Sequence, residues 1–200
     1  MNFHSFTVDV GWIAVVMSLV VAYTQFKRMT KHGVEGVSLA TWTLFLYLDI
    51  FWILYGVAVH SWQLIIGCSI ALPLQLLIWF ELKPFTRFRV SLQSFALFIA
   101  FSTLPALQWG WAGAAVGAGL VGWVTRAPQL VHLVRYETAK GVSVSSWATA
   151  GMGSGLWVIY YFGARLWPVL YVTAVGGLVS LIIAALAKWR HRRQANAFAS

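Results

Sequence analysis

Residues 36–56 read GVSLATWTLFLYLDIFWILYG, and residues 141–161 read GVSVSSWATAGMGSGLWVIYY. An offset of 105 residues aligns seven identical pairs in and just after these stretches, and three of the pairs are tryptophans. A match of this extent at one offset indicates an internal duplication, and a duplicated apolar unit predicts two similar halves with a site between them. The identical pairs are Gly36 and Gly141, Val37 and Val142, Ser38 and Ser143, Trp42 and Trp147, Trp52 and Trp157, Tyr55 and Tyr160, and Trp62 and Trp167.

The composition places the chain in a membrane. Hydrophobic residues make up 60% of it, charged residues only 10%, and the mean hydropathy is +0.76. A soluble domain carries much more charge than this. The net charge of +9 comes from short basic clusters between apolar runs, which is typical of membrane topology rather than of a nucleic-acid-binding surface. Cys68 is the only cysteine, so no intrachain disulfide is expected.

The apolar runs predict an all-α integral membrane protein with seven transmembrane helices, because a bilayer core of about 30 Å needs roughly 20 apolar residues per helix. Two parallel three-helix bundles, joined by a linker helix, would account for the repeat (3+1+3). The expected spans are 8–26, 39–59, 62–80, 90–107, 110–130, 145–163 and 166–187. The expected units are a first repeat at 1–80, a linker at 81–108, a second repeat at 109–187 and a basic tail at 188–200.

The basic residues predict the orientation. Of the 14 lysines and arginines, 13 fall on one side of the membrane in this arrangement of spans, and only Arg165 falls on the other side. The positive-inside rule therefore puts the N-terminus outside and the C-terminus in the cytoplasm of a multi-pass protein, which we expect in the inner (plasma) membrane of a bacterium. The residues on the cytoplasmic side would be Lys27, Arg28, Lys31, Lys83, Arg87, Arg89, Arg126, Arg135, Lys140, Lys188, Arg190, Arg192 and Arg193.

A proline–glutamine pair precedes the second copy of the repeated stretch. Pro128-Gln129 lies near the cytoplasmic end of a predicted helix, and KGVSVSSW follows from Lys140 after a basic loop. This pattern resembles the PQ-loop repeat, and the 3+1+3 layout resembles the SWEET-type (MtN3/saliva-like) transporters, whose bacterial half-size relatives are three-helix units that dimerise. The first copy has Thr24-Gln25 at this place.

The resemblance implies transport of a small solute by alternating access, without a cofactor. It gives Pro128, Gln129 and Gln25 hinge or gating roles, because proline weakens a helix locally. Thr24 could at most bend its helix by bonding back to a carbonyl.

The resemblance also implies substrate-binding positions. Trp52 and Trp157 match the tryptophans that hold the solute in SWEET-type proteins. The matching asparagine positions are occupied by Cys68 and Thr173. Cysteine and threonine cannot reproduce the donor and acceptor of an asparagine amide. The solute therefore stays open among sugar-like, amino-acid and nucleoside-like molecules.

Asp49 is the polar residue that the resemblance does not explain. It lies eleven residues after Ser38, about 16 Å along a helix and so near the bilayer midplane. Acidic residues at that depth usually face a cavity and mark a pathway. Asp49 would share a face with Trp52, and its repeat mate is Ser154. It would carry a proton, pair with a cationic substrate, or serve only packing.

The alternatives to a transporter are an intramembrane enzyme and a receptor or binding protein. An intramembrane enzyme needs paired carboxylates, a serine dyad or metal ligands. Asp49 is the one aspartate expected at membrane depth, since Asp9 lies at an interface, and the predicted spans hold no histidine, so neither an enzyme nor a metal site is expected. A SWEET-like receptor or binding protein without transport stays the alternative. The expected partners are a small molecule, the lipid bilayer and protons. Two repeats complete one pathway, so a monomer is the functional minimum and oligomers stay open.

Overall fold

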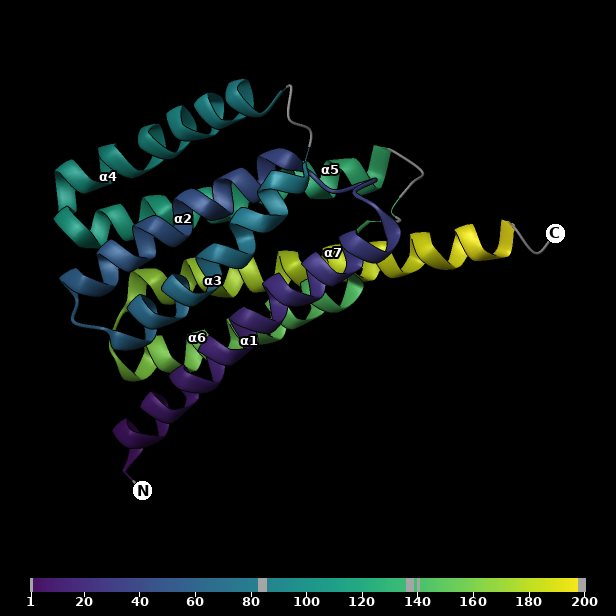
Figure 1. The fold of residues 1–200 in the computed structure, drawn as a ribbon. Coiled ribbons are helices and arrows are strands. Elements are labelled where there is room, and N and C mark those ends of the chain that lie inside the picture. Colours follow the sequence, from purple (N-terminus) through teal and green to yellow (C-terminus); the bar gives the residue numbers. More distant parts are fainter. Residues whose placement is uncertain (1, 83–85, 136–138, 140, 198–200) are drawn as a thin grey trace.

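The computed structural model describes residues 2–82, 86–135, 139 and 141–197. These residues form helices joined by short connections, without a strand among them. Lys83, Glu137 and Lys140, which belong to the predicted basic loops, lie outside the described residues. The helices are α1 (Phe3–His32), α2 (Leu39–Ala58), α3 (Trp62–Glu81), α4 (Arg87–Val124), α5 (Ala127–Arg135), α6 (Val144–Gly163) and α7 (Trp167–Ala197) (Figure 1).

Both copies of the repeated stretch begin a helix in the same way. Ser38 caps α2 by accepting a hydrogen bond from the amide of Thr41 (3.3 Å), and Ser143 caps α6 by accepting one from the amide of Ser146 (3.0 Å). A serine at this position satisfies an amide that has no partner within the helix. The shared Gly-Val-Ser sequence therefore fixes where these two helices start.

Helix α4 contains a reversal of the chain. Trp109 and Gly110 leave the helical conformation, and Gly110 has φ 56°, a left-handed value that favours glycine. The two arms of α4 then run back along each other, since Gly113 faces the backbone of Pro105 and Gly117 faces that of Phe101. The expected boundary between spans 90–107 and 110–130 coincides with this reversal.

The expected span 110–130 is not one helix. It is interrupted at Thr125 and Arg126, and α5 begins at Ala127. Pro128 explains the interruption, because a proline ring collides with the carbonyl four residues earlier, here that of Val124. The hydroxyl of Thr125 also bonds back to the carbonyl of Val121 (2.6 Å). The break places Arg126 between two helical segments.

Two other helices are longer than the sequence predicts. Helix α1 begins at Phe3, after Asn2, whose side chain accepts a hydrogen bond from the amide of Ser5 (2.8 Å). It ends at His32, and Gly33 follows it with φ 82°. Helix α7 continues to Ala197, so most of the expected basic tail is helical. Hydropathy marks only the part of a helix inside the bilayer, and capping marks its true ends.

Five segments are long and apolar enough to cross a membrane among the residues that the structure describes. Helix α6 has 20 residues, the same length as α2 and α3, but its glycine, serine and threonine content lowers its hydropathy. The five segments are Ser5–His32, Leu39–Ala58, Trp62–Glu81, Arg87–Arg135 and Trp167–Ala195. The chain is thus an all-helical protein with the features of a membrane protein.

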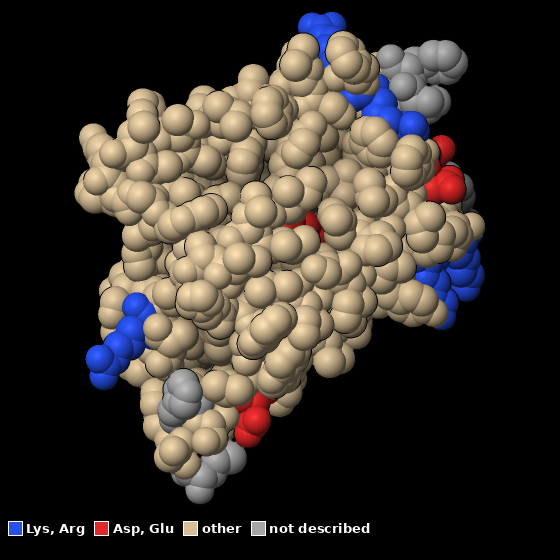
Figure 2. Space-filling view, turned by 60° about the vertical axis from the view of Figure 1, so that its left-hand side comes forward, with Lys and Arg blue, Asp and Glu red and all other residues tan. Residues whose placement is uncertain are grey.

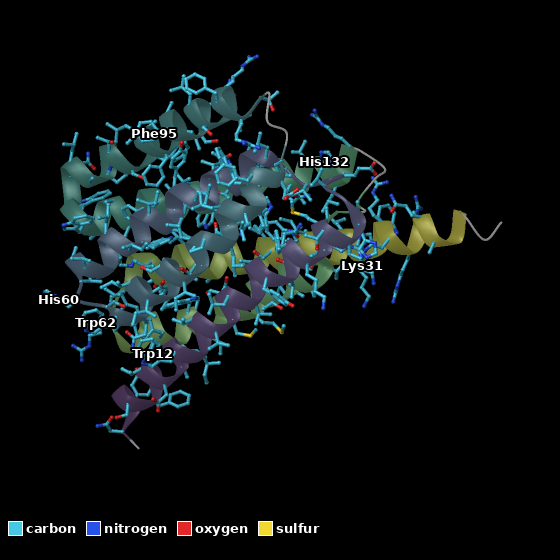
Figure 3. The ribbon with its side chains drawn as sticks, viewed as in Figure 1. Trp12, Lys31, His60, Trp62, Phe95 and His132 are labelled. Atoms are coloured by element: carbon cyan, nitrogen blue, oxygen red, sulfur yellow. The ribbon has the colours of Figure 1, made fainter. Side chains whose placement is uncertain are left out.

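The outer surface fits a lipid environment. Figure 2 shows a broad, mostly uncharged face with an acidic surface in a recess near its middle, and most basic side chains lie toward the top and right of the view. Large apolar side chains are exposed on the molecule, including Phe88, Leu104 and Leu107 at 70–82% exposure. Figure 3 shows Trp12, His60 and Trp62 toward one end of the molecule and Lys31 toward the other.

The helices of each sequence repeat pack together, and the two repeats meet where α1 packs against α6 and where α2 packs against α4. Helix α1 packs against α3 and α6, and α6 also packs against α7. Helix α2 packs against α3 and α4, and α4 also packs against α7. One core cluster joins Leu48 of α2, Ala118 of α4, and Tyr161 of α6. The space that this packing leaves in the interior contains the candidate site.

Candidate functional site

A cavity of about 230 Å³ lies inside the bundle. Its walls come from α1, α2, α3, α4, α6 and α7, and therefore from both sequence repeats. Small-molecule pockets usually measure about 300–1,000 Å³, so this cavity suits a small solute. In the space-filling view, an acidic surface is visible in a recess near the middle of the apolar face (Figure 2).

The structure brings all six predicted substrate-binding residues into the wall of this one cavity. Their role in binding stays a prediction. They are Asp49 and Trp52 from α2, Cys68 from α3, Ser154 and Trp157 from α6, and Thr173 from α7.

The two tryptophans are held by neighbouring side chains. The ring of Trp157 stacks on Tyr161, with 5.5 Å between centroids, and its indole nitrogen donates to the hydroxyl of Ser18 (3.3 Å). The ring of Trp52 packs edge-on against Phe51 (5.1 Å) and Tyr55 (5.6 Å). Such contacts restrict the rotation of each indole, so both present a fixed apolar surface to the cavity.

Asp49 is incompletely satisfied. The side chain of Gln75 on α3 lies close enough to interact with it. Both Asp49 Oδ2 and Gln75 Oε1 are buried, and neither has a hydrogen-bond partner among the described residues. Buried polar atoms without a partner are rare in native proteins and often belong to functional sites. Trp52, three residues later, lines the same cavity, in agreement with the i, i+3 spacing.

Arg126 is the cavity residue that the sequence analysis missed. It was counted with the basic residues at the cytoplasmic surface, but the structure places it in the cavity wall. Its Nε donates to the hydroxyl of Ser180 (2.9 Å), its Nη1 bonds to the carbonyl of Gly122, and its guanidinium lies 5.6 Å from the ring centre of Phe45. One signal was available: Arg126 precedes the Pro-Gln pair by two residues, and therefore lies before the predicted end of the helix.

Gln25 and Gln129 form a reciprocal set of hydrogen bonds, here called the glutamine clasp. Each glutamine is buried and binds the start of the repeated stretch in the other repeat. Its Nε2 donates to one carbonyl (2.9 Å for Gln25, 2.8 Å for Gln129), and its Oε1 accepts from one amide (3.1 Å in both). The backbone partners are Gly141 and Ser143 for Gln25, and Gly36 and Ser38 for Gln129.

The residues before the two glutamines differ. Pro128 is the second residue of α5 and follows the interruption at Thr125 and Arg126. Thr24 lies inside the continuous helix α1, where its hydroxyl bonds back to the carbonyl of Val20 (2.7 Å). The two equivalent helices are thus broken in one repeat and continuous in the other.

The end of the cavity opposite the clasp carries its own polar contacts. The hydroxyl of Tyr160 lies 2.8 Å from that of Ser61 and donates to Gln63 Oε1 (3.3 Å). The ring of Tyr160 also packs closely against Gly11 of α1. These contacts join α6 to α1 and α3 beyond the cavity.

Comparison of the chain with models of protein families, with curated proteins and with solved structures found no match. Within the described residues, no group of three histidine, cysteine or acidic side chains is placed to hold a metal ion.

Proposed function

We propose that this chain is a membrane transporter that moves a small polar solute by alternating access around the central cavity. The observation that carries the proposal is the position of the cavity, which is enclosed by helices of both repeats, and these repeats are also joined by the reciprocal glutamine clasp. A site between two similar halves is the arrangement on which alternating access depends. The solute classes considered are sugar-like, amino-acid and nucleoside-like molecules.

The proposed topology is 3+1+3 with the N-terminus outside, as in SWEET-type proteins. The reversal at Trp109 and Gly110 supports it, because the first arm of α4 then serves as the linker helix and the second arm opens the second repeat. The packing supports it too, since α1 packs against α6 while α4 packs against α2, and these pairs are equivalent under the repeat. The basic residues would then face the cytoplasm.

The glutamine clasp is proposed as the cytoplasmic gate. Release of a solute on that side would require its four hydrogen bonds to break. At about 1 kcal/mol net for each bond, opening would require about 4 kcal/mol, comparable with the few kcal/mol that separate two states of a switching protein. The interruption before Pro128 gives the second repeat a place to bend.

Transport is tested by counterflow in proteoliposomes. Purified protein is reconstituted with each of a set of unlabelled sugars, amino acids and nucleosides inside, and entry of the same labelled compound is followed. We expect saturable entry of at least one compound, absent from liposomes without protein. Saturable binding without entry would favour the receptor alternative. The proposal would be contradicted if every compound failed both to bind and to enter.

A further inference from the structure

The cavity wall carries one acidic and one basic side chain that do not pair with each other. Asp49 comes from α2 in the first repeat, and Arg126 lies between α4 and α5 in the second. Among the described residues, the partners of Arg126 are a hydroxyl, a carbonyl and an aromatic ring, and no carboxylate. An ionisable group inside a membrane protein is costly to charge unless something compensates it, so an acid and a base in one cavity, neither with a charged partner, need an explanation.

The Asp49 side of the cavity lacks donors. Asp49 Oδ2 and Gln75 Oε1 are both buried acceptors without a partner among the described residues. An ammonium group carries three N–H donors and a positive charge, so it can donate to more than one acceptor and compensate a carboxylate. A neutral hydroxyl can donate only one hydrogen bond and leaves the carboxylate charge in place.

The Arg126 side lacks an acceptor. Nε and Nη1 are used by Ser180 and Gly122, and no bond of Nη2 to a described residue is present. Guanidinium groups bind carboxylates with particular strength, because the bonds are charge-assisted and the geometry matches. The ring centre of Phe45 lies 5.6 Å from the guanidinium carbon, where its π-electrons attract the positive charge.

The size of the cavity suits a small molecule between the two groups. Asp49 and Arg126 line the same cavity of about 230 Å³. This is below the usual range of small-molecule pockets, about 300–1,000 Å³, so a solute that binds both groups has to be small. It would form a charge-assisted hydrogen bond of about 2.8 Å to each side.

We infer that the solute is a small amino-acid-like zwitterion, whose carboxylate binds Arg126 and whose ammonium group binds Asp49 and Gln75. The inference rests on the proposed function for its transport, but the binding can be tested by itself. Trp52 and Trp157 would pack on the rest of the molecule. A neutral sugar or nucleoside would leave both charges uncompensated, and such a mismatch of buried charge excludes a ligand strongly.

The wild-type protein provides the first test. Purified protein is titrated with the twenty common L-amino acids, glucose, adenosine and phosphoethanolamine, the last as an analogue of a lipid headgroup. Binding is measured as a shift in melting temperature and by calorimetry. For each amino acid that binds, its amide removes the carboxylate and its deaminated acid removes the ammonium group. We expect both analogues to bind at least ten times more weakly than the parent.

Variants then assign each charge. Arg126→Gln should bring the amino acid and its amide to within about twofold of each other, and Asp49→Asn should do the same for the amino acid and its deaminated acid. Arg135→Gln and Asp9→Asn, both at exposed positions, remove the same charges outside the cavity and should leave the tenfold gaps unchanged. If a cavity variant does not fold, the analogue series in the wild-type protein decides.

The inference is overturned if no amino acid binds, if either analogue binds as tightly as its parent, or if glucose, adenosine or phosphoethanolamine binds more tightly than every amino acid. Failure of transport gives a different result. Zwitterion binding without counterflow would support the inference and contradict the transporter, whereas counterflow of a neutral solute alone would support the transporter and overturn the inference.

Discussion

Trp157 is fixed in the cavity wall by a stacked tyrosine on one side and a hydrogen-bonded serine on the other. Trp52 has an equivalent place in the other repeat, held by two aromatic neighbours instead. Both rings are only half-buried, so part of each indole stays available to a solute. Their contribution to binding can therefore be separated from their contribution to packing.

Replacing Trp157 with alanine should weaken solute binding by about 1–3 kcal/mol, the range for removing a large apolar contact surface. Calorimetry on the purified variant measures this. Trp62→Ala, which removes an indole that is 66% exposed, is the matched control and should not affect binding. A fall in the free energy of unfolding that equals the loss of binding would show that Trp157 serves packing.

Asp49→Asn keeps the shape of the side chain and removes its charge. If Asp49 binds an ammonium group, the variant should bind the solute at least tenfold more weakly at every pH at which it stays folded. If Asp49 carries a proton, the variant should lose accumulation driven by external acid and keep solute exchange. Proteoliposome uptake with and without a pH gradient measures both, and behaviour like the wild type in both assays would assign Asp49 to packing.

The spacing of polar and aromatic residues was sufficient to predict part of the site. Asp49 was predicted from its depth, and Trp52 from its match to a tryptophan of SWEET-type proteins and to Trp157 in the repeat; both line the cavity, and their role in binding stays a prediction. Arg126 was not predicted, because its position between a glycine-rich helix and a basic loop made it look like one more cytoplasmic charge. Its inward direction depends on the interruption at Thr125, on Ser180 and on Phe45, which are far apart in sequence.

The helices that carry Gln25 and Gln129 hold the two repeats together at one end. Each glutamine satisfies a carbonyl and an amide that begin a helix of the other repeat. The sequence predicted a gating or hinge role for both positions but gave no partner for either. The partners are backbone atoms, which carry no sequence signal, so only the fold reveals them.

Gln129→Ala should favour the state that is open at the clasp end. The variant leaves the carbonyl of Gly36 and the amide of Ser38 without a partner, a loss of about 1–3 kcal/mol, or roughly 5- to 150-fold in the equilibrium. Cys68, the single cysteine, lines the cavity and reports the opening. A membrane-impermeant thiol reagent added from the clasp side should label it faster by that factor.

Lys27→Ala, at an exposed position of α1, is the control for this experiment and should leave the labelling rate unchanged. An unchanged rate in Gln129→Ala would show that the clasp does not limit access to the cavity.

The close approach of the two arms of α4 leads to a prediction about the stability of the protein. A Cβ atom at Gly117 would overlap the backbone of Phe101, which cannot move aside as a side chain can. Gly117→Ala should therefore lower the free energy of unfolding by about 1–3 kcal/mol, as overpacking does. Gly155→Ala is the control, because nothing lies within 4 Å of its added Cβ. Equal melting temperatures for the two variants would contradict the close packing of the arms.

At the scale of the whole molecule, the sequence predicted the helical character well but predicted the ends of the helices less well. Apolar length predicted where helices cross a bilayer, but α1 and α7 extend well beyond those limits, and one expected span is divided. Hydropathy averages over many residues and cannot detect a cap at Asn2 or a collision at Pro128. The cavity itself depends on contacts between repeats, and no single stretch of sequence encodes it.

The orientation can be tested with two exposed positions in a Cys68→Ser background. Arg165→Cys lies at the end of the molecule that we expect outside, and Arg192→Cys lies on the expected cytoplasmic part of α7. In intact cells, an impermeant thiol reagent should label the first and not the second. The reverse pattern would overturn the proposed topology.

The glutamine clasp has a consequence for the direction in which a solute lies. Each glutamine binds backbone atoms whose equivalents its own repeat also contains, so two identical copies of one repeat would form the same contacts equally well. Identical copies, however, would surround the cavity with the same groups on both sides, and a solute could enter in either of two equivalent poses. Ser154 stands opposite Asp49 in the repeat, and Ala22 stands opposite Arg126 when Gln25 is aligned with Gln129, one residue out of step with the offset of 105. Because one chain joins two unequal repeats, the cavity carries different groups on its two sides, and these groups would bind an asymmetric solute in one orientation.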